Sequence, residues 1–430
     1  MRAVQPPRSA YAWYVVAILT LANVSGFVDR QILSLLVEPI RRDLGLSLTQ
    51  MGTLMGLPFA VFFTLMGLPL ARLADSWSRR GVIGIGIALW SVMTAVSGLA
   101  GSYAKLLLAR VGVGVGEASL QAPAVSLIAD YFPEERRATA QSVYATGVFL
   151  GSGLAYYIGG WMVGLVSVQE QWTLPLVGAV RPWQTVFFMV GLPGLAIAAL
   201  MWTVREPGRA DATGGAAPLA EVRAWIRGNA AVVSLYAAGF AASATVNYAI
   251  AAWLNRWMVV SLDYTVARAG MVQGLLTMTV GAVGVVAGGR LSDWLSRRSP
   301  DNAPVFVGII GAAGMIAFGA ATFIGSSAGA AVALLAGINL FAALPWGAAQ
   351  AGASSLVPGP IRAQGIALFV LVVNLIAFTL GPLSVAWITD AFFGGNEIFL
   401  GSSLAIVTVA GMTIAIGLLL GVRQARRRRT

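Results

Sequence analysis

The segment ARLADSWSRR, residues 71–80, recurs 218 residues later as GRLSDWLSRR, residues 289–298. Both copies place Arg, Leu, Asp, Ser and a final Arg-Arg pair at the same positions, and both follow a long apolar run. The offset is close to half of the 430 residues. A shorter echo, Pro-x-x-x-Arg, begins at Pro133 and again at Pro358. Internal similarity at half the chain length indicates two related halves joined in tandem.

The composition indicates that most of the surface of this chain faces lipid. Hydrophobic residues make up 58% of the sequence and charged residues only 10%, whereas a soluble domain is about a quarter charged. A helix needs about 20 mostly apolar residues to cross a bilayer. Twelve stretches meet this requirement, and they are residues 12–38, 48–74, 82–101, 104–130, 138–166, 182–204, 231–260, 266–292, 303–324, 327–350, 361–391 and 398–422.

Together with the repeat, these spans predict an all-α membrane protein with twelve transmembrane helices in two pseudo-symmetric six-helix bundles. A segment with several prolines, glycines and charges separates the sixth span from the seventh, and residues 221–227 within it are expected to form a short surface helix. The expected organisation is an N-terminal bundle at residues 1–204, a cytoplasmic linker at 205–229, a C-terminal bundle at 230–422 and a basic cytoplasmic tail at 423–430.

Arginine and lysine are distributed unevenly among the loops, and this asymmetry predicts the orientation. With both termini in the cytoplasm, most basic residues fall on the cytoplasmic side, and only a few, such as Lys105 and Arg181, lie outside. The net charge of +11 therefore reports membrane topology. The tail is expected to lie on anionic lipid rather than to bind nucleic acid. The absence of cysteine and of a cleavable leader suits a bacterial inner membrane.

The chain contains no histidine and no cysteine. This excludes Ser-His triads, cysteine nucleophiles and metal sites built from these residues. We therefore expect no enzymatic activity, no metal and no cofactor. A carboxylate or a tyrosine must carry any proton that the protein moves. A membrane-embedded enzyme and a channel are the alternatives of other classes; the first lacks a nucleophile–base pair, and the second has no evident use for the repeated loop.

The repeated Asp-x-x-x-Arg-Arg loop resembles the signature loop of the major facilitator superfamily, although Ala71 stands where that family usually has glycine. The resemblance covers the whole chain and implies alternating access by two halves. The charges of the loop would hold the cytoplasmic side closed until the halves rock apart; the alternative is a charge cluster that only sets topology. The residues expected to gate are Asp75, Arg79, Arg80, Asp130, Arg136, Asp293, Arg297 and Arg298.

A narrower resemblance covers roughly residues 25–160. The segments RVGVGVGEAS, residues 110–119, and GSGLAY, residues 151–156, together with Asp29-Arg30, resemble the spinster family of lipid transporters. This resemblance implies that the substrate is a lysophospholipid or a sphingoid lipid. We expect protons and membrane lipids as the other partners and a monomer as the working unit. The alternative is a proton-coupled exporter of drugs or other hydrophobic organic solutes.

Four charged residues stand out deep inside predicted spans, where a charge is costly and usually faces a cavity or a partner. Asp29 and Arg110 are expected at similar depth, with Glu117 nearer the midplane and on the same face of its helix as Arg110. We predict that Asp29 and Glu117 carry the coupling proton and that Arg110 switches between them. The alternative is a static network that fixes helix packing. Arg30 could pair with the phosphate of an anionic lipid or serve the structure only.

The C-terminal half has no central carboxylate, since the 218-residue offset places Asn247 opposite Asp29 and Tyr248 opposite Arg30. This asymmetry predicts proton handling in the first half and substrate contact in the second. The candidate contacts are Arg30, Asn247, Tyr248, Trp253, Trp257, Phe341 and Trp346. The alternative for each aromatic, and the commoner one, is packing in the core, against lipid or at the membrane interface. Gly112 and Gly116, four residues apart, predict close helix packing. The glycines of the fifth span loosely resemble an antiporter signature, which favours exchange of protons for substrate.

Overall fold

The structure, a computed structural model, describes residues 9–175, 177–207, 219–299, 301–325 and 328–428. The chain forms two compact units: unit 1 is Met1–Thr213 with Thr265–Gly274, and unit 2 is Gly214–Tyr264 with Leu275–Thr430. Within the described residues, twelve helical segments are long and apolar enough to cross a membrane. The predicted fold class, an all-helical chain with twelve spans, is confirmed.

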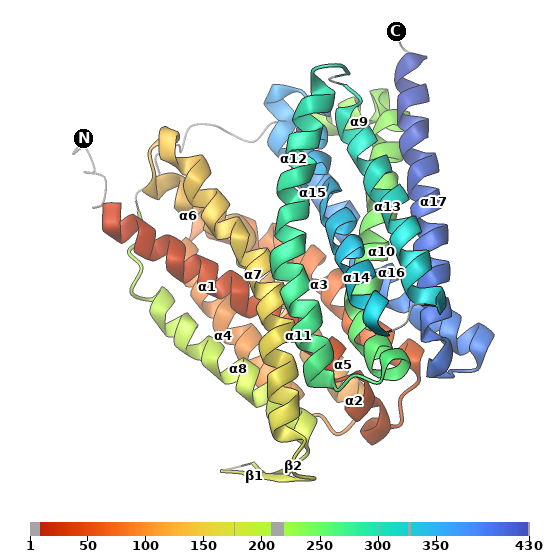
Figure 1. Ribbon diagram of the computed structural model, residues 1–430. Coiled ribbons are helices and arrows are strands. Elements are labelled where there is room, and N and C mark those ends of the chain that lie inside the picture. The colour runs from red at the N-terminus through yellow and green to blue at the C-terminus, as the bar shows by residue number, and fades with distance from the viewer. Residues whose placement is uncertain (1–8, 176, 208–218, 300, 326–327, 429–430) are drawn as a thin grey trace. The chain divides into compact units, whose positions relative to one another are not determined.

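Figure 1 labels the elements of both units. Those of unit 1 are α1 (Ser9–Leu35), α2 (Val37–Leu44), α3 (Leu48–Ser76), α4 (Arg79–Ser97), α5 (Tyr103–Glu117), α6 (Gln121–Tyr131), α7 (Glu134–Val166), β1 (Trp172–Leu174), β2 (Gly178–Val180) and α8 (Pro182–Met201). The eighth span begins with α11 (Val266–Leu276), most of which belongs to unit 1.

The remaining elements belong to unit 2. They are α9 (Leu219–Gly228), α10 (Ala230–Leu262), the π-helical turn Thr277–Gly281, α12 (Ala282–Ser296), α13 (Ala303–Gly325), α14 (Ala328–Ala343), α15 (Pro345–Leu356), α16 (Arg362–Phe393) and α17 (Leu400–Arg427), with short 3-10 turns at Gly359–Ile361 and Glu397–Phe399. The short helix expected at residues 221–227 is present as α9.

Prolines explain where the predicted spans are interrupted. The first span ends at Leu35 rather than at residue 38, because Pro39 has no N–H to donate to the carbonyl oxygen of Leu35. The short helix α2 begins at Val37. The fourth span divides into α5 and α6 close to Pro123, and the tenth divides into α14 and α15 at Pro345. The small β1–β2 hairpin, with Gly178 at φ +87°, was not predicted.

Equivalent helices pack in the same way within each unit. In unit 1, α1 packs on α7, and α4 packs on both α5 and α8. In unit 2 the corresponding pairs are α10 with α16, α13 with α14 and α13 with α17. Figure 1 shows α1 beside α7 and α13 beside α17. The shared packing scheme is the structural counterpart of the sequence repeat and makes the two bundles pseudo-symmetric.

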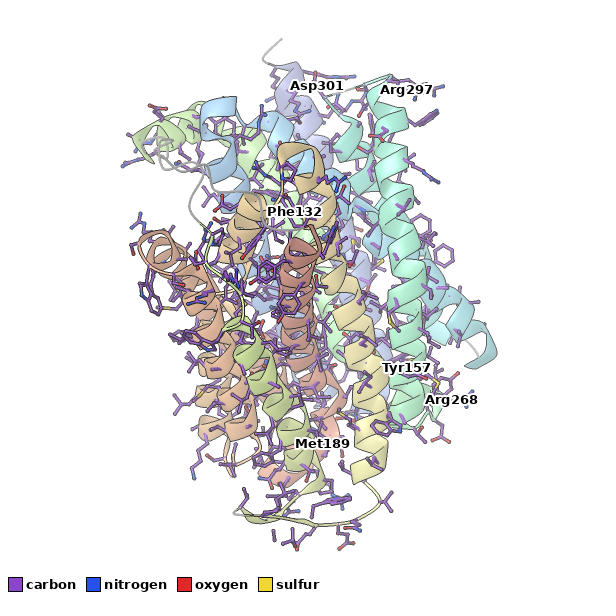
Figure 2. The ribbon with its side chains drawn as sticks, turned by 90° about the vertical axis from the view of Figure 1, so that its left-hand side faces the viewer. Phe132, Tyr157, Met189, Arg268, Arg297 and Asp301 are labelled. Carbon is purple, nitrogen blue, oxygen red and sulfur yellow. The ribbon has the colours of Figure 1, made fainter. Side chains whose placement is uncertain are left out.

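The first part of α11 packs on α7 within unit 1. The backbone of Gly270 lies against Tyr156 and Gly160, and that of Gly274 lies against Gly153 and Tyr157. Figure 2 shows Tyr157 and Arg268, which stands at the beginning of α11, at the same end of this unit and away from Phe132. Glycines on both helices let the two backbones approach closely.

Glycines also set the spacing between α4 and α5, as the sequence predicted for Gly112 and Gly116. A methyl group at Gly116 would lie 2.7 Å from the backbone nitrogen of Trp90 and 2.8 Å from the carbonyl oxygen of Gly86. We expect Gly116→Ala to lower the free energy of unfolding by about 1–3 kcal/mol, because rigid backbone must move to admit the methyl group. Thermal unfolding in detergent measures the effect.

Gly67→Ala is the matched control, since a methyl group at that helical position of α3 would meet no atom within 4 Å. It should leave stability unchanged or raise it slightly, because alanine has less conformational freedom to lose on folding. Equal melting temperatures for Gly116→Ala and Gly67→Ala would contradict this account of the α4–α5 contact.

Candidate functional site

Two buried ion pairs connect α1 and α5. Nη1 of Arg110 donates a hydrogen bond to Oδ1 of Asp29 over 3.3 Å, and Nη2 of Arg30 donates to Oε2 of Glu117 over 2.5 Å. The side chains of Asp29, Arg110 and Glu117 are each at most 4% exposed, and that of Arg30 is 12% exposed. The four charges sum to zero, which reduces the cost of burying them inside a membrane-spanning bundle.

Helix geometry explains why both pairs form. Asp29 and Arg30 are consecutive on α1, so their side chains leave the helix about 100° apart. Arg110 and Glu117 are seven residues apart on α5, close to two turns, and therefore share a face. The structure thus brings together Asp29, Arg110 and Glu117, as the sequence suggested. It adds Arg30, which the sequence assigned to the substrate, as the partner of Glu117.

Each carboxylate uses only one of its two oxygens in these pairs. Oδ2 of Asp29 and Oε1 of Glu117 are buried and have no hydrogen-bond partner within the part of the chain that the structure describes. Thr94 of α4 is a further neighbour of the Asp29 carboxylate. The Glu117 carboxylate packs against Gly26, where an added methyl group would lie 3.6 Å from it. A buried carboxylate oxygen without a donor is a place where a proton can bind.

Aromatic rings surround the Arg30 end of the cluster. The guanidinium carbon of Arg30 lies 4.3 Å from the ring centre of Phe59, 4.7 Å from that of Phe27 and 5.7 Å from that of Phe63. A small cavity adjoins this group, and its lining includes Phe27, Phe63, Glu117 and the exposed Gln121. The ion pair of Arg30 is therefore at the wall of a cavity within unit 1.

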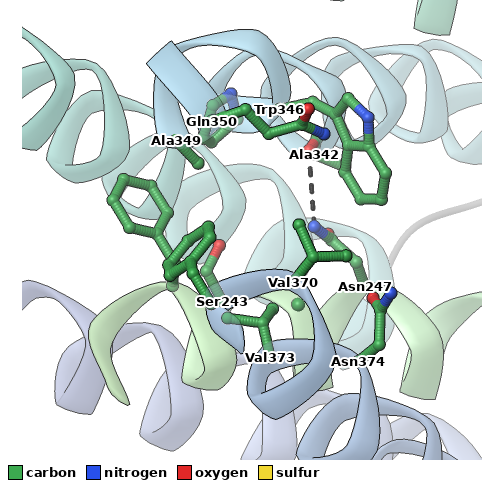
Figure 3. A pocket seen from close by; sticks show the side chains of 13 residues that line it. Ser243, Asn247, Ala342, Trp346, Ala349, Gln350, Val370, Val373 and Asn374 are labelled. Carbon is green, nitrogen blue, oxygen red and sulfur yellow. Dashed lines mark hydrogen bonds between the residues drawn. The ribbon is translucent and has the colours of Figure 1, made fainter. Parts of the chain in front are cut away.

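Unit 2 contains more than one cavity, and the one considered as a substrate site lies between α10, α15 and α16. Its walls are mainly apolar, and its polar groups come from Ser243, Asn247, Gln350 and Asn374. Nδ2 of Asn247 donates to the carbonyl oxygen of Ala342 over 3.3 Å, while Oδ1 has no partner among the described residues. Figure 3 shows Asn247 next to Asn374, with the side chain of Trp346 across the cavity.

The six candidate substrate contacts that lie in unit 2 fall into two groups, and the seventh, Arg30, lies in unit 1 on Glu117. Asn247 and Trp346 line the cavity of unit 2. The other four pack inside the unit: Trp253 is fully buried and donates from Nε1 to the carbonyl oxygen of Pro382, Trp257 packs edge-on against Phe323, Phe341 stacks on Phe318, and Tyr248 contacts the ring of Phe378.

Ser243, Gln350 and Asn374 also line this cavity, and none of them was predicted as a substrate contact. An isolated amide in the middle of an apolar span was the available signal for Asn374 and Gln350. Ser243 gave no such signal, because serine is common in membrane helices and can bond to its own backbone.

Among the expected gating residues, Arg79 has the most contacts. Its guanidinium is buried, forms an ion pair with Asp130, and donates to Oε1 of Glu206 at 2.8 Å and to Ser126. Arg80 donates to the carbonyl oxygen of Val204. Glu206, which follows the sixth span, was not predicted to belong to this network. The side chain of Asp75 lies outside the described residues.

The equivalent loop of unit 2 differs from the loop of unit 1. Asp293 and Arg297 are exposed, and the guanidinium of Arg298 lies 4.3 Å from the ring centre of Trp294. Arg136 of unit 1 is exposed as well. The same sequence signature thus forms a buried hydrogen-bonded network in unit 1 and an exposed charged surface in unit 2.

Glu206 accepts three hydrogen bonds, which predicts how the stability of unit 1 depends on pH. Burial alone would raise the pKa of Glu206, but the bonds from Arg79, the Arg80 backbone N–H and Ser78 outweigh it, so the pKa lies below its ordinary value of 4.5. A lowered carboxylate pKa stabilises the fold above the unfolded-state pKa, and the effect is lost as the pH falls below about 4.5.

We expect Glu206→Gln to lower the free energy of unfolding at pH 7 by roughly 1–2 kcal/mol, because the charge-assisted bonds are lost at a site partly exposed to solvent. The difference from the parent protein should shrink when melting is measured below pH 4.5. Glu170→Gln, at an exposed position after α7, should change neither value. A destabilisation by Glu206→Gln that is equal at both pH values would refute the ionic account.

The chain is similar to known membrane transporters. Its residues 19–382 match the family model of the Major Facilitator Superfamily. An MFS-type efflux pump of Mycolicibacterium smegmatis is 27% identical over 297 residues, 67% of this chain and 64% of that protein. Human spinster homolog 1 is 29% identical over 332 residues, 72% of this chain and 59% of that protein. The chain therefore spans less than two thirds of each of these curated relatives.

A solved structure is similar over almost the full length. It is the crystal structure of a bacterial homolog of the human lysosomal transporter spinster, in an inward-facing and occupied conformation. The two chains are 29% identical, the TM-score is 0.82, and the match covers 98% of each. The resemblance to spinster proteins inferred from residues 25–160 thus extends to the second half of the chain.

Proposed function

This chain belongs to the Major Facilitator Superfamily of membrane transporters, and from that premise we propose that it couples proton movement to the transport of an amphipathic lipid such as a lysophospholipid or a sphingoid lipid. It works by alternating access as a single chain. The observation that carries the proposal is the pair of buried carboxylates, Asp29 and Glu117, each opposed by an arginine and each with one oxygen that has no partner among the described residues.

The coupling step is an exchange between a proton and a guanidinium on the same carboxylate. When Glu117 takes up a proton it no longer attracts Arg30, and Arg30 is released toward the cavity beside it. The same exchange applies to Asp29 and Arg110. Each site then holds either a proton or an arginine, which is the condition for coupling protonation to a change in shape. In this proposal Arg110, which lies on the same face of α5 as Glu117, switches between Asp29 and Glu117.

An amphipathic substrate fits the cavity of unit 2. Its walls are mainly apolar, and a few amide groups from Asn247, Gln350 and Asn374 can orient a polar head. The similarity to spinster proteins supports the lipid class. Asn247 and Trp346 are the proposed substrate contacts in unit 2, and Arg30, at the wall of the cavity in unit 1, is the proposed side chain that makes way for substrate there. The Arg79 network of unit 1, together with Arg80, Asp130 and Glu206, is the proposed cytoplasmic gate.

The orientation that we propose places both termini in the cytoplasm of a bacterial inner membrane. The tail helix α17 ends in a run of arginines, and the two signature loops at residues 71–80 and 289–298 are also rich in arginine. Positive charge concentrates on the cytoplasmic side of membrane proteins. Protease accessibility of the tail in inside-out and right-side-out vesicles tests this orientation.

The test of the function is uptake of a labelled lysophospholipid by proteoliposomes, with and without an imposed pH gradient. Uptake that exceeds that of protein-free liposomes and rises with the gradient is the expected result. Uptake that does not change with the pH gradient would contradict proton coupling. If folded protein moves no lysophospholipid, the proposed lipid substrate is wrong.

Export of drugs or other hydrophobic organic solutes is the second candidate. It is supported by the similarity to the efflux pump of M. smegmatis and by the mainly apolar cavity. A panel of labelled lysolipids and lipophilic dyes in the same proteoliposomes separates the two. Gradient-dependent movement of dyes without lysolipids would favour the exporter.

A further inference from the structure

The guanidinium of Arg30 occupies a site whose walls suit organic cations in general. The guanidinium carbon of Arg30 lies 4.3–5.7 Å from the centres of three phenylalanine rings. One is Phe27 of α1, and the other two are Phe59 and Phe63 of α3. Phe59 and Phe63 stack on each other with ring centres 5.2 Å apart. Aromatic faces attract cations, and groups of such rings recognise quaternary ammonium ligands.

A carboxylate closes this aromatic site. Oε2 of Glu117 lies 2.5 Å from Nη2 of Arg30, and the Glu117 side chain is 4% exposed. Rings that wall a site next to one buried carboxylate form a pocket that neutralises a monovalent cation in a poorly hydrated place. The guanidinium reaches this pocket on a long flexible stem, so Arg30 can leave it without a change in the backbone.

The adjoining cavity gives a competitor access to this site, and withdrawal of the Arg30 side chain provides the space for it. The walls of the cavity share Phe27, Phe63 and Glu117 with the aromatic site. An anionic group entering here would meet Glu117 and the negative faces of the rings. A cationic group would meet complementary charge as soon as Arg30 moved aside.

We propose that the site formed by Phe27, Phe59, Phe63 and Glu117 binds the ammonium group of a ligand, and that Arg30 is a tethered competitor that fills it when no ligand is present. If the proposed transport function holds, this site selects substrates with a cationic head. The binding itself does not depend on transport.

The test is calorimetric titration of the purified full chain in a neutral detergent with tetramethylammonium. Removing the competitor with Arg30→Ala should increase the affinity at least tenfold relative to the parent protein. Choline should bind Arg30→Ala as well, whereas its uncharged carbon isostere, 3,3-dimethylbutanol, should not. Unchanged affinity in Arg30→Ala, or equal binding of the uncharged isostere, would overturn the proposal.

Variants of the walls make the test specific. In the Arg30→Ala background, Phe59→Leu should weaken tetramethylammonium binding by about 5- to 30-fold, which is the range expected for loss of a desolvated cation–π contact. Glu117→Gln should weaken it further. Phe187→Leu is the control, because Phe187 is an equally buried ring of unit 1 that contacts Trp183. Equal effects of Phe59→Leu and Phe187→Leu would count against the site.

Two further measurements cover a variant that fails to fold and the nature of the ligand. If Arg30→Ala does not give a monodisperse folded protein, Arg30→Gln removes the charge while keeping the stem, and the same gain in affinity is required of it. Dodecyltrimethylammonium compared with tetramethylammonium distinguishes a lipid headgroup from a free solute: tighter binding of the amphiphile assigns the site to lipids. Loss of cation binding with intact gradient-driven lipid uptake would refute this inference alone, and the reverse result would refute only the proposed transport function.

Discussion

Glu117→Gln is expected to abolish the stimulation of uptake by a pH gradient, with at least a tenfold fall in gradient-driven lysophospholipid transport. The glutamine keeps the size of the side chain but cannot exchange a proton, and it no longer holds Arg30 by charge. Exchange of labelled for unlabelled substrate across the same membrane, which needs no net proton movement, should be much less affected. Parallel measurements of gradient-driven uptake and of exchange in one proteoliposome preparation check this.

Two further variants test whether the effect is specific to the buried carboxylates. Asp29→Asn should show the same pattern if both carboxylates take part, and a normal gradient response if only Glu117 does. Glu170→Gln, an exposed carboxylate in the loop after α7, should behave like the parent protein. An unchanged gradient dependence in both Glu117→Gln and Asp29→Asn would rule out the coupling role of this cluster and favour a static network between α1 and α5.

Arg110→Gln is expected to lower the free energy of unfolding by about 3–5 kcal/mol, because it leaves the carboxylate of Asp29 buried without its cation. Asp29 is only 2% exposed, and Arg110 is the residue that forms its ion pair. Removing both charges should be far milder, since an uncharged pair of similar volume has no ionic desolvation to offset. The double variant Asp29→Asn with Arg110→Gln should therefore recover more than half of the loss.

Thermal unfolding of the single and double variants measures this coupling as a double-mutant cycle. Lys105→Gln is the matched control, because it removes a cation from an exposed position of the same helix, α5, and should be nearly neutral. If the double variant is as unstable as the sum of the two single variants, the two residues do not interact and the ion pair does not account for their burial.

Much of the fold follows from local sequence properties. A span of about 20 apolar residues can satisfy its backbone only as a helix when it crosses lipid, so hydropathy was sufficient to find all twelve spans of the described chain. The repeated loop at residues 71–80 and 289–298 indicated that the spans form two related sets, and the equivalent packing of helices in both units agrees. The interruptions near Pro123 and Pro345 also had a local cause.

The positions of the charged groups along the predicted spans were enough to predict their depth, because each residue of a helix adds a constant rise. The sequence could not determine their partners. Asp29 and Arg30 leave α1 in directions about 100° apart, and only the placement of α1 relative to α5 decides that Arg110 pairs with the first and Glu117 with the second.

Tertiary structure alone also decided which apolar residues face a cavity. Lipid, protein core and an apolar cavity all accept tryptophan and phenylalanine, so hydropathy does not distinguish Trp346, which lines the cavity of unit 2, from Trp253, which is fully buried. The same holds for the two signature loops: the sequence repeats, but Arg79 is buried because Asp130 and Glu206 surround it, and Arg297 remains exposed. Depth is encoded along one helix, whereas orientation and partners depend on how several helices pack together.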